Sequence, residues 1–323
     1  MNEKFAILDR LSFVLKSELE FAIPVAAIKV LTEAIDQDNA STMSELMATL
    51  DEAIKKLKSA PFCSPVPIAA GCDLFQRFVT RSSPDFTDFS AFKSHIITRG
   101  QQFVSKAGSC RSLISNLAVQ FIQDNKVVLI HSFSRVVMSA LQLALTLNKQ
   151  FRVYVTESRP SSSGLQAVKT LQDSGVHATL IMDGAVGYIM DQVDLVLVGA
   201  EGVVENGGLI NQIGTYQIAM IAKACNVPLY CLAESFKFVR LFPLNQKDLP
   251  INTPLIMPYI SIPDIKGSPQ THTLPDKEQL CSSLMVENPS LDYTPPNYIT
   301  LLVTDLGVLT PSGVSDELVK LYF

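Results

Sequence analysis

The sequence of 323 residues lacks several features that would identify a function at once: it has no tryptophan, only four histidines and no CxxC pair among its six cysteines. The histidines stand far apart, at positions 95, 131, 177 and 272, without the spacing that metal ligands need. Because no two cysteines have the CxxC spacing, the thiols are expected to be reduced. We therefore expect no metal site and no cofactor.

Long apolar runs and an excess of basic charge are missing as well. No apolar run approaches the roughly 20 residues that cross a bilayer, and the first fifteen residues carry both acidic and basic side chains. The net charge of −5 argues against a nucleic-acid-binding protein, which needs a concentrated basic surface. The sequence thus predicts a cytoplasmic protein with neither a membrane nor a nucleic acid as partner.

The first part of the chain, residues 1–122, has apolar residues at helical spacing, for example Leu46, Leu50, Ile54 and Leu57. Thr42 and Glu45 have the spacing of a capping box at the start of that helix. Three prolines within residues 61–67 predict a break without helix. We expect this part to be an all-helical domain.

From about residue 123 onward, short β-rich runs alternate with helical stretches. Strands are expected at 127–130, 151–156, 178–182, 195–198, 229–232 and 299–303, and helices at 136–147, 164–172, 186–191 and 213–225. This alternation is typical of an α/β fold with a Rossmann-like, doubly wound and mainly parallel sheet. Residues 246–296 are rich in proline and have no strong period, so a long insertion is predicted in the second domain, 123–323.

The block from Asp194 to Thr215 predicts a ligand pocket. A run of four apolar residues, 195–198, indicates a strand buried on both faces, and glycines follow it where parallel sheets bind ligands. Glycines allow a close approach of the backbone to an anion. We expect Asn211 and Gln212 to offer donors at the start of the next helix, with Glu201 facing the same space.

Polar residues follow the other predicted strands too, and we expect all of them to converge on one crevice. The predicted ligand-binding residues are His131, Ser132, Arg135, Glu157, Arg159, Gly164, Asp183, Glu201, Asn211 and Gln212. A cation and hydroxyl groups beside helix N-termini suit a phosphate, so a sugar phosphate or a nucleoside monophosphate is the predicted ligand.

Structural interpretations of the same residues stay open. His131 can be a hydrogen-bonded structural histidine, Glu157 and Arg159 can pair with each other, and the serines at 161–163 can cap a helix. The usual motifs of other enzyme classes are absent from the sequence. It has no GxGxxG after the first strand, no GxxxxGK[ST] loop and no GxSxG elbow, which disfavours dehydrogenase, NTPase and hydrolase functions.

Six segments carry a resemblance to a known family. They are VLIHSFSR at 128–135, VYVTESRP at 153–160, VGAEGVVENGG at 198–208, AESFKFVRLFPLN at 233–245, and TDLGVLTP with SDELVKLY between 304 and 322. In these segments the chain closely resembles the regulatory alpha subunits of eukaryotic translation initiation factor 2B. That superfamily also contains ribose-1,5-bisphosphate and methylthioribose-1-phosphate isomerases.

The resemblance implies that the isomerase chemistry is lost. The family's catalytic cysteine corresponds to Ser132, its catalytic aspartate to Glu201, and a lysine expected beside Asn211 corresponds to Gln212. A hydroxyl is a far weaker acid than a thiol, and glutamate is one methylene longer than aspartate. The alternatives are an active aldose–ketose isomerase, or a pocket that still binds a phosphorylated sugar or nucleotide.

The resemblance also implies the partners. Such a subunit forms a homodimer through its sheet domain and assembles with the beta, gamma, delta and epsilon subunits of initiation factor 2B. With its helical domain it helps to sense initiation factor 2 phosphorylated on its alpha subunit, so that stress inhibits nucleotide exchange. The exchange reaction itself belongs to another subunit. Lys16, Lys29, Arg77 and Arg81 are the candidate residues facing that partner.

Overall fold

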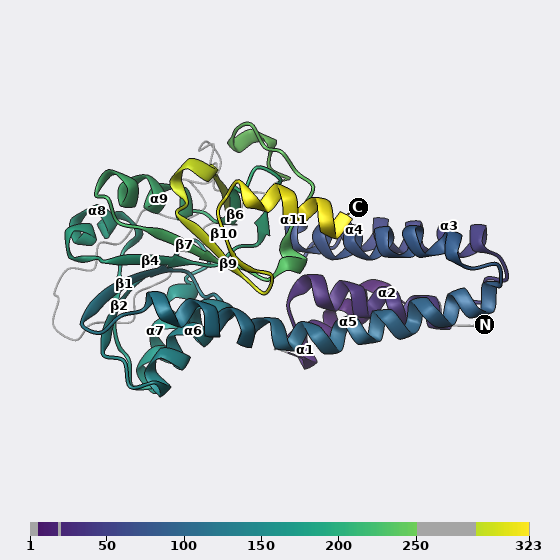
Figure 1. Cartoon of the computed structure of the whole chain (residues 1–323), viewed down its shortest axis with the longest axis horizontal. Coiled ribbons are helices and arrows are strands. Elements are labelled where there is room, and N and C mark those ends of the chain that lie inside the picture. The colour runs from purple at the N-terminus through teal and green to yellow at the C-terminus, as the bar shows by residue number, and fades with distance from the viewer. Residues whose placement is uncertain (1–5, 19–20, 251–288, 323) are drawn as a thin grey trace, which may run out of the picture.

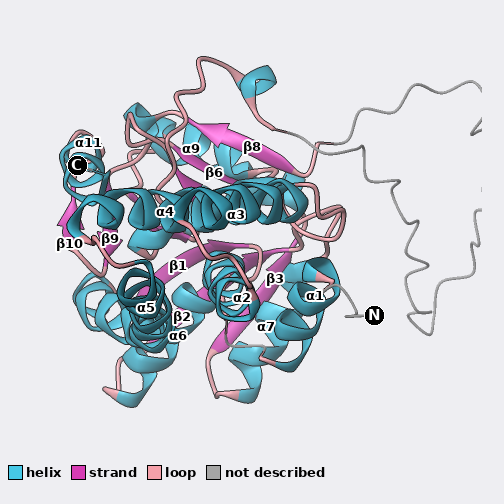
Figure 2. Cartoon of the chain, turned by 90° about the vertical axis from the view of Figure 1, so that its right-hand side faces the viewer, coloured by secondary structure: helices cyan, strands magenta, loops and turns pink. Residues whose placement is uncertain are grey.

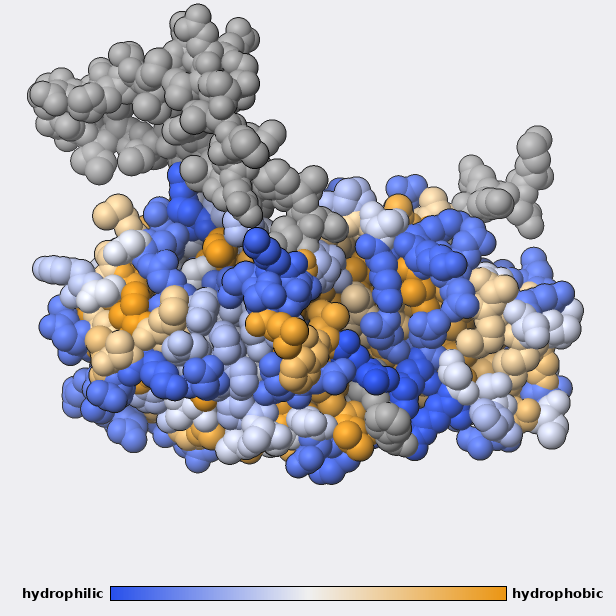
Figure 3. Space-filling model, turned by 90° about the horizontal axis from the view of Figure 1, so that it is seen from above, coloured by the Kyte–Doolittle hydropathy of each residue, from blue (hydrophilic) through white to orange (hydrophobic). Residues whose placement is uncertain are grey.

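The computed structural model describes residues 6–18, 21–250 and 289–322. Helices form one end of this structure and a sheet flanked by helices forms the other (Figure 1). Among the helices of the described residues, none is long and apolar enough to cross a membrane. Seen from above, the surface is mainly hydrophilic with separate apolar patches (Figure 3).

In the part of the helical half that the structure describes, five α-helices pack around one apolar core. They are α1 (Ile7–Ser17), α2 (Ile23–Gln37), α3 (Met43–Lys58), α4 (Pro65–Ser82) and α5 (Phe89–Ala118). The predicted capping box is confirmed: Thr42 accepts a hydrogen bond from the backbone N–H of Glu45, whose carboxylate accepts one from the N–H of Thr42. The helix α2 lies in the middle, and buried residues such as Ile28 and Leu31 pack against its neighbours.

The prediction that residues 61–67 contain no helix is wrong for residues 65–67. Helix α4 begins at Pro65, and Pro67 lies in its first turn. The first turn of a helix tolerates proline because its N–H groups have no intrahelical partner there. The prolines therefore mark where α4 begins.

The large sheet has seven strands in the order β10-β9-β7-β4-β1-β2-β3. Their bounds are β1 (Lys126–His131), β2 (Phe151–Thr156), β3 (His177–Ile181), β4 (Leu195–Val198), β7 (Leu229–Leu232), β9 (Leu301–Thr304) and β10 (Gly307–Leu309). All neighbouring strands pair in parallel except β10, which pairs antiparallel with β9. The predicted mainly parallel sheet is confirmed, and β10 is an addition that the sequence did not reveal.

Helices cover both faces of the sheet, as expected for a doubly wound fold (Figure 1). They are α6 (Arg135–Thr146), α7 (Ser163–Asp173), α8 (Val186–Ile189), α9 (Thr215–Ala224) and α11 (Gly313–Tyr322). The core on one face contains Leu141 of α6 and Leu171 of α7, and the core on the other contains Ile189 of α8, Ile218 of α9 and Val314 of α11. The fold class predicted from the sequence is confirmed.

A second sheet corrects the prediction for the block that follows β4. Strands β5 (Gly202–Val203), β6 (Leu209–Gln212) and β8 (Leu291–Thr294) form a small antiparallel sheet with β6 in the middle. Asn211 and Gln212 therefore lie in a strand, not at the start of a helix, since α9 begins at Thr215. The block reverses direction to form a hairpin, which the run of glycines allows.

The stretch predicted as an insertion contains the third strand of that sheet. Strand β8 is fully buried, so the last part of residues 246–296 belongs to the folded core. Residues 246–248 form a short 3₁₀ helix, and residues 251–288 lie outside the described residues. The proposed domain boundary near residue 122 remains a prediction. Helix α5 joins the two halves, because Ile114 and Ala118 near its C-terminal end pack in the core of the large sheet.

Candidate functional site

A cavity of about 180 Å³ lies where the helical half meets the carboxyl ends of β1 and β4. We call it the main pocket. It is lined from the sheet side by residues 131–136, 199–201, 211 and 212, by Glu234 and Lys237, and from the helical side by residues 22–24 and Pro67. Six of the ten predicted ligand-binding residues therefore lie around one cavity: His131, Ser132, Arg135, Glu201, Asn211 and Gln212.

His131 ends β1 and is almost completely buried. Its Nε2 lies 3.0 Å from the carbonyl oxygen of Ile213, so Nε2 carries a proton and donates, and its Nδ1 lies 2.6 Å from the hydroxyl of Thr156. Burial lowers the pKa of His131, which keeps the imidazole neutral. Both ring nitrogens are occupied by protein groups, so His131 ties the end of β2 to the loop before α9, as its structural interpretation predicts.

Ser132 follows in a left-handed backbone conformation, with φ of 63°, and its side chain is part of a short chain of hydroxyl groups. The Oγ atoms of Ser132 and Ser163 lie 2.7 Å apart, and those of Ser161 and Ser163 lie 3.0 Å apart. Next along the chain, Ser134 caps α6, and Arg135 at its first position donates from Nη1 to the carbonyl oxygen of Phe21, 2.6 Å away. Arg135 thereby connects the pocket with the segment that precedes α2.

Glu201 lies just beyond the end of β4, and its carboxylate accepts two hydrogen bonds. One comes from the hydroxyl of Ser64, immediately before α4, and the other from the amide of Gln212 in β6. Asn211, beside Gln212, donates from Nδ2 to the hydroxyl of Thr215 over 3.1 Å. The carboxylate of Glu201 is therefore fixed from both the helical half and the small sheet.

The other four predicted residues line no part of the main pocket. Asp183 accepts hydrogen bonds from the backbone N–H groups of Ser158 and Arg159, and the guanidinium of Arg159 donates to Ser162 over 3.1 Å. Gly164 lies in the first turn of α7, where a Cβ atom would come within 1.8 Å of the carbonyl oxygen of Thr156. Glu157, whose N–H donates to the carbonyl oxygen of Ile181, and Arg159 lie in the turn between β2 and α7, and Asp183 contacts this turn from the end of β3.

Two charged residues of the main pocket were missed from the sequence. Glu234, with 3% of its surface exposed, and Lys237 lie after β7 and form an ion pair with an N–O distance of 3.0 Å. Burial opposes the ionisation of Glu234, but the neighbouring Lys237 outweighs it and the pKa of Glu234 is lowered. Both residues lie in the segment AESFKFVRLFPLN, which carries part of the family resemblance and follows the expected strand at 229–232, and its position after a strand could have identified them.

Taken together, the pocket presents two cations, Arg135 and Lys237, two carboxylates, Glu201 and Glu234, and several hydroxyl and amide groups. Such a set can hold a polyhydroxylated anion, because the cations attract the charge and the carboxylates accept from hydroxyl groups. No cysteine lines the cavity in the described part of the chain. Within the same residues, no group of three or more His, Cys, Asp or Glu side chains is arranged to hold a metal ion.

Comparison with known proteins gives a consistent result. The model of the family described as "Initiation factor 2 subunit family" matches residues 18–311. The translation initiation factor eIF2B subunit alpha of Dictyostelium discoideum is 46% identical to this chain over 324 residues, which cover 100% of the chain and 98% of the relative. The corresponding protein of Caenorhabditis elegans is 35% identical and covers 92% of both.

Enzymes and solved structures are also among the relatives. The ribose 1,5-bisphosphate isomerase of Methanocaldococcus jannaschii is 32% identical over 68% of this chain and 67% of its own length. A translation initiation factor eIF-2B structure from Pyrococcus horikoshii OT3 superimposes with a TM-score of 0.71 at 20% identity, covering 95% of this chain and 98% of that one. The tetrameric eIF2B-beta2-delta2 complex from C. thermophilum gives a TM-score of 0.73 at 18% identity, covering 98% and 94%. These two structures share the fold.

Proposed function

Because the chain belongs to the initiation factor 2 subunit family, we propose that it is the non-catalytic alpha subunit of initiation factor 2B, the guanine-nucleotide exchange factor for initiation factor 2. In this function it acts in the cytoplasm, bridges the decameric complex as a homodimer, and binds the beta, gamma, delta and epsilon subunits. It helps to sense initiation factor 2 that is phosphorylated on its alpha subunit, and thereby inhibits exchange under stress.

The observation that carries the non-catalytic part of the proposal is the position of Glu201 between Ser64 and Gln212. A carboxylate that removes a proton from a substrate needs an oxygen that can reach that proton. Both oxygens of Glu201 are engaged by donors of the protein itself. Ser132, which stands where the isomerases are expected to carry a cysteine, shares its hydroxyl with Ser163, and a serine hydroxyl is a poor proton donor at neutral pH.

An activity assay tests this part directly. The purified chain should not interconvert ribose-1,5-bisphosphate or methylthioribose-1-phosphate with the ketose forms above the rate of a buffer control. A related isomerase assayed in parallel is the positive control. Turnover at an enzymatic rate that Glu201→Ala abolishes would overturn the proposal and favour the isomerase alternative.

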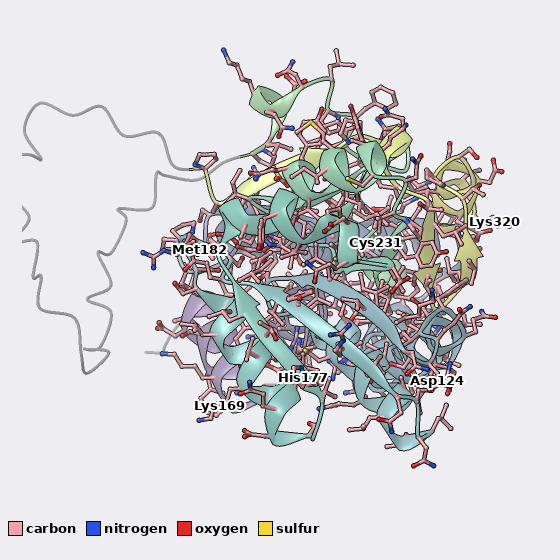
Figure 4. All side chains as sticks on the ribbon, turned by 90° about the vertical axis from the view of Figure 1, so that its left-hand side faces the viewer. Asp124, Lys169, His177, Met182, Cys231 and Lys320 are labelled. Atoms are coloured by element: carbon pink, nitrogen blue, oxygen red, sulfur yellow. The ribbon has the colours of Figure 1, made fainter. Side chains whose placement is uncertain are left out.

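Exposed apolar residues at one edge of the large sheet support the homodimer. Strand β3 is an edge strand, and Leu180, Met182 and Tyr188 near its end and on α8 are 38%, 68% and 83% exposed. Figure 4 places Met182 beside the end of this strand. Large apolar side chains gathered on one edge are typical of protein interfaces. Sedimentation of Tyr188→Asp should show a larger monomer fraction than unsubstituted chain, whereas Phe13→Asp, at an exposed position on α1, should not.

The sensing function is tested with the assembled complex. Initiation factor 2, phosphorylated or not, is captured with complexes that contain or lack this chain, and the phosphorylated form should bind more tightly only when the chain is present. Equal binding in all four cases contradicts the proposal. Among the candidate contact residues, Lys29 already pairs with Glu18, whereas Lys16 and Arg81 are exposed. The last two are therefore the first to substitute.

The main pocket supports a retained ligand-binding function within the regulatory subunit. Arg135 and Lys237 supply positive charge, and Asn211, Gln212 and Ser132 supply polar groups for a sugar phosphate or nucleoside monophosphate. A ligand that binds the folded chain raises its melting temperature with concentration. Titration with sugar phosphates should therefore raise the melting temperature progressively, and no shift at millimolar concentrations contradicts this function without affecting the proposed subunit identity.

A further inference from the structure

A second and larger cavity lies mainly between helices of the helical half. Helices α4 and α5 both pack closely against α2 but meet each other only at a few positions. In Figures 1 and 2 α4 lies above α5, with the two helices apart from each other. The space between them forms a cavity of about 400 Å³, which we call the α4–α5 groove. This volume is in the range of sites that bind small molecules.

The two walls of the groove come from equivalent faces of the two helices. Residues 74, 75, 77, 78 and 81 of α4 line one wall, and residues 99, 100, 102, 103 and 106 of α5 line the other. Both sets have the spacing of one helix face, with residues three and four positions apart. Ile28 of α2 contributes to the floor, and Phe236, after β7, closes the groove beside Phe103, with ring centres 6.2 Å apart.

The interior of the groove is apolar. Leu74, Phe75, Phe78, Phe103 and Phe236 line it together with Ile28, and Phe75 and Phe236 are buried. Gly100 contributes a wall without a side chain, because a Cβ atom there would come within 2.3 Å of the hydroxyl of Thr32 behind it. An apolar ligand would remove these surfaces from water, which favours binding.

The charges of the groove have one sign. Arg77, Arg81, Arg99 and Lys106 line it, and no carboxylate does so among the described residues. Arg81, Arg99 and Lys106 are exposed, so they surround the apolar interior at its solvent side. A concave surface of one sign attracts ions of the opposite sign. The groove is thus complementary to a molecule with an apolar body and an anionic head.

We propose that the α4–α5 groove binds a small amphipathic acid, namely an aliphatic or aromatic chain that ends in a carboxylate or phosphate. The chain lies on Phe75, Phe103 and Phe236, and the head contacts Arg81, Arg99 or Lys106. An inorganic anion leaves the apolar interior uncovered, and a neutral lipid offers no negative charge to Arg81, Arg99 and Lys106. The site shares no lining residue with the main pocket, although Arg77 and Arg81 are also candidate contacts for phosphorylated initiation factor 2.

The absence of tryptophan from the chain allows a direct binding test. Phe78→Trp introduces a single fluorescent reporter into the wall of the groove, and Phe62→Trp, at an exposed position before α4, is the control. Dodecanoate that carries a bromine atom at its end should quench the Phe78→Trp reporter in a saturable way and leave the Phe62→Trp reporter unchanged. Equal quenching of both reporters contradicts the proposal.

The parts of the ligand are tested separately on the unsubstituted full-length chain by calorimetry. Dodecanoate and dodecyl phosphate should each bind with a stoichiometry near one, whereas dodecanol and acetate should bind at least about tenfold more weakly, since each lacks one half of the recognition. The two acids also identify the preferred head group. If dodecanol binds as tightly as dodecanoate, or if an acidic phosphopeptide binds the groove and neither amphipathic acid does, the proposal is wrong.

Charge reversal locates the head group. The double substitution Arg81→Glu with Lys106→Glu should weaken dodecanoate binding by about tenfold or more, because it replaces attraction of the anionic head group by repulsion. Lys169→Glu, on α7 in the sheet half and labelled in Figure 4, reverses an exposed cation far from the groove and should leave the affinity unchanged. Circular dichroism verifies that each variant is folded. Equal affinities of all three folded proteins contradict the proposal.

Discussion

The hydroxyl of Ser64 donates a hydrogen bond to the carboxylate of Glu201, and these residues are 137 positions apart in the chain. Ser64 directly precedes α4 of the helical half, whereas Glu201 follows β4 of the large sheet. The contact crosses the junction between the two halves at the wall of the main pocket. It therefore connects the two halves and fixes the carboxylate of Glu201 at the same time.

Removal of this hydroxyl should loosen the junction. We expect Ser64→Ala to lower the free energy of unfolding by about 1 kcal/mol, the usual contribution of a hydrogen bond to a charged group that is partly accessible to water. Urea denaturation followed by circular dichroism measures the change. Ser109→Ala is the matched control, because its hydroxyl bonds only to the carbonyl oxygen of Lys106 within the exposed face of α5, and it should cost less than about 0.5 kcal/mol. An equal decrease in the free energy of unfolding in both variants would show that the contact with Glu201 does not stabilise the chain.

Substitution tests whether Lys237 binds the anionic group of a ligand in the main pocket. Substitution of Lys237 alone would leave Glu234 as an unpaired buried charge, so the test uses Lys237→Gln combined with Glu234→Gln. We expect this pair to weaken the binding of a sugar phosphate by about tenfold, which corresponds to the loss of one charge-assisted contact. Arg159→Gln should change the affinity less than about twofold, because Arg159 lies outside the main pocket. The reverse order of effects would support the site as it was predicted from the sequence.

Glycine at position 164 is required by packing. In Gly164→Ala the new methyl group would meet the carbonyl oxygen of Thr156 at 1.8 Å, and this oxygen belongs to the backbone and cannot move freely. We expect a loss of about 3 kcal/mol or more in the free energy of unfolding. Gly108→Ala is the control, since a Cβ atom at Gly108 of α5 has no neighbour within 4 Å. That substitution should stabilise the helix by about 0.5–1 kcal/mol, and a loss of stability there would contradict the geometry.

Asp292 of β8 should give the stability a measurable pH dependence. Burial raises the pKa of its carboxyl group from 3.8 to about 7, although it accepts hydrogen bonds from the N–H groups of Gly214 and Tyr216. Between about pH 4 and pH 7 the folded chain keeps a proton that the unfolded chain releases, so this contribution to stability falls as the pH rises. Between about pH 5 and pH 8 the free energy of unfolding of the unsubstituted chain should therefore fall by about 2–3 kcal/mol more than that of Asp292→Asn.

The comparison of the two proteins removes the effect of His131, which has the opposite sign. The pKa of His131 is lowered by burial, so its contribution to stability is lost as the pH falls below the ordinary histidine value of 6.5. This contribution is present in both proteins and cancels in the difference. Urea midpoints across the pH range give the measurement, and parallel curves for the two proteins would contradict an elevated pKa of Asp292.

The parallel strands and the helices between them could be predicted because each is determined by a local pattern. The expected strand at 151–156 matches β2, and the expected helix at 164–172 lies within α7. The small sheet could not be predicted in this way. Its strand β6 pairs with β8, so that Ile210 lies opposite Tyr293, and no local pattern records a partner more than 80 residues away.

The candidate site shows the same limit. His131, Ser132 and Glu201 follow strands of one parallel sheet, so the rule for strand ends brings them together correctly. Arg159 and Asp183 also follow strands but do not reach the pocket, because the carboxylate of Asp183 accepts from the backbone N–H groups of Ser158 and Arg159 and the guanidinium of Arg159 donates to Ser162. Ser64 reaches the site from the helical half, and only the packing of the two halves reveals such a residue.

Helix α2 and the segment after β7 each contribute to both cavities. Pro24 lines the main pocket and Ile28, roughly 6 Å further along α2, lines the α4–α5 groove, while Lys237 and Phe236 face the two cavities as chain neighbours. A ligand that displaces either element in one cavity must therefore change the shape of the other. By thermodynamic reciprocity, the first ligand changes the affinity for the second by the same factor by which the second changes the affinity for the first. If both proposed sites are occupied, the shared elements are therefore expected to couple the binding of the sugar phosphate to that of the amphipathic acid.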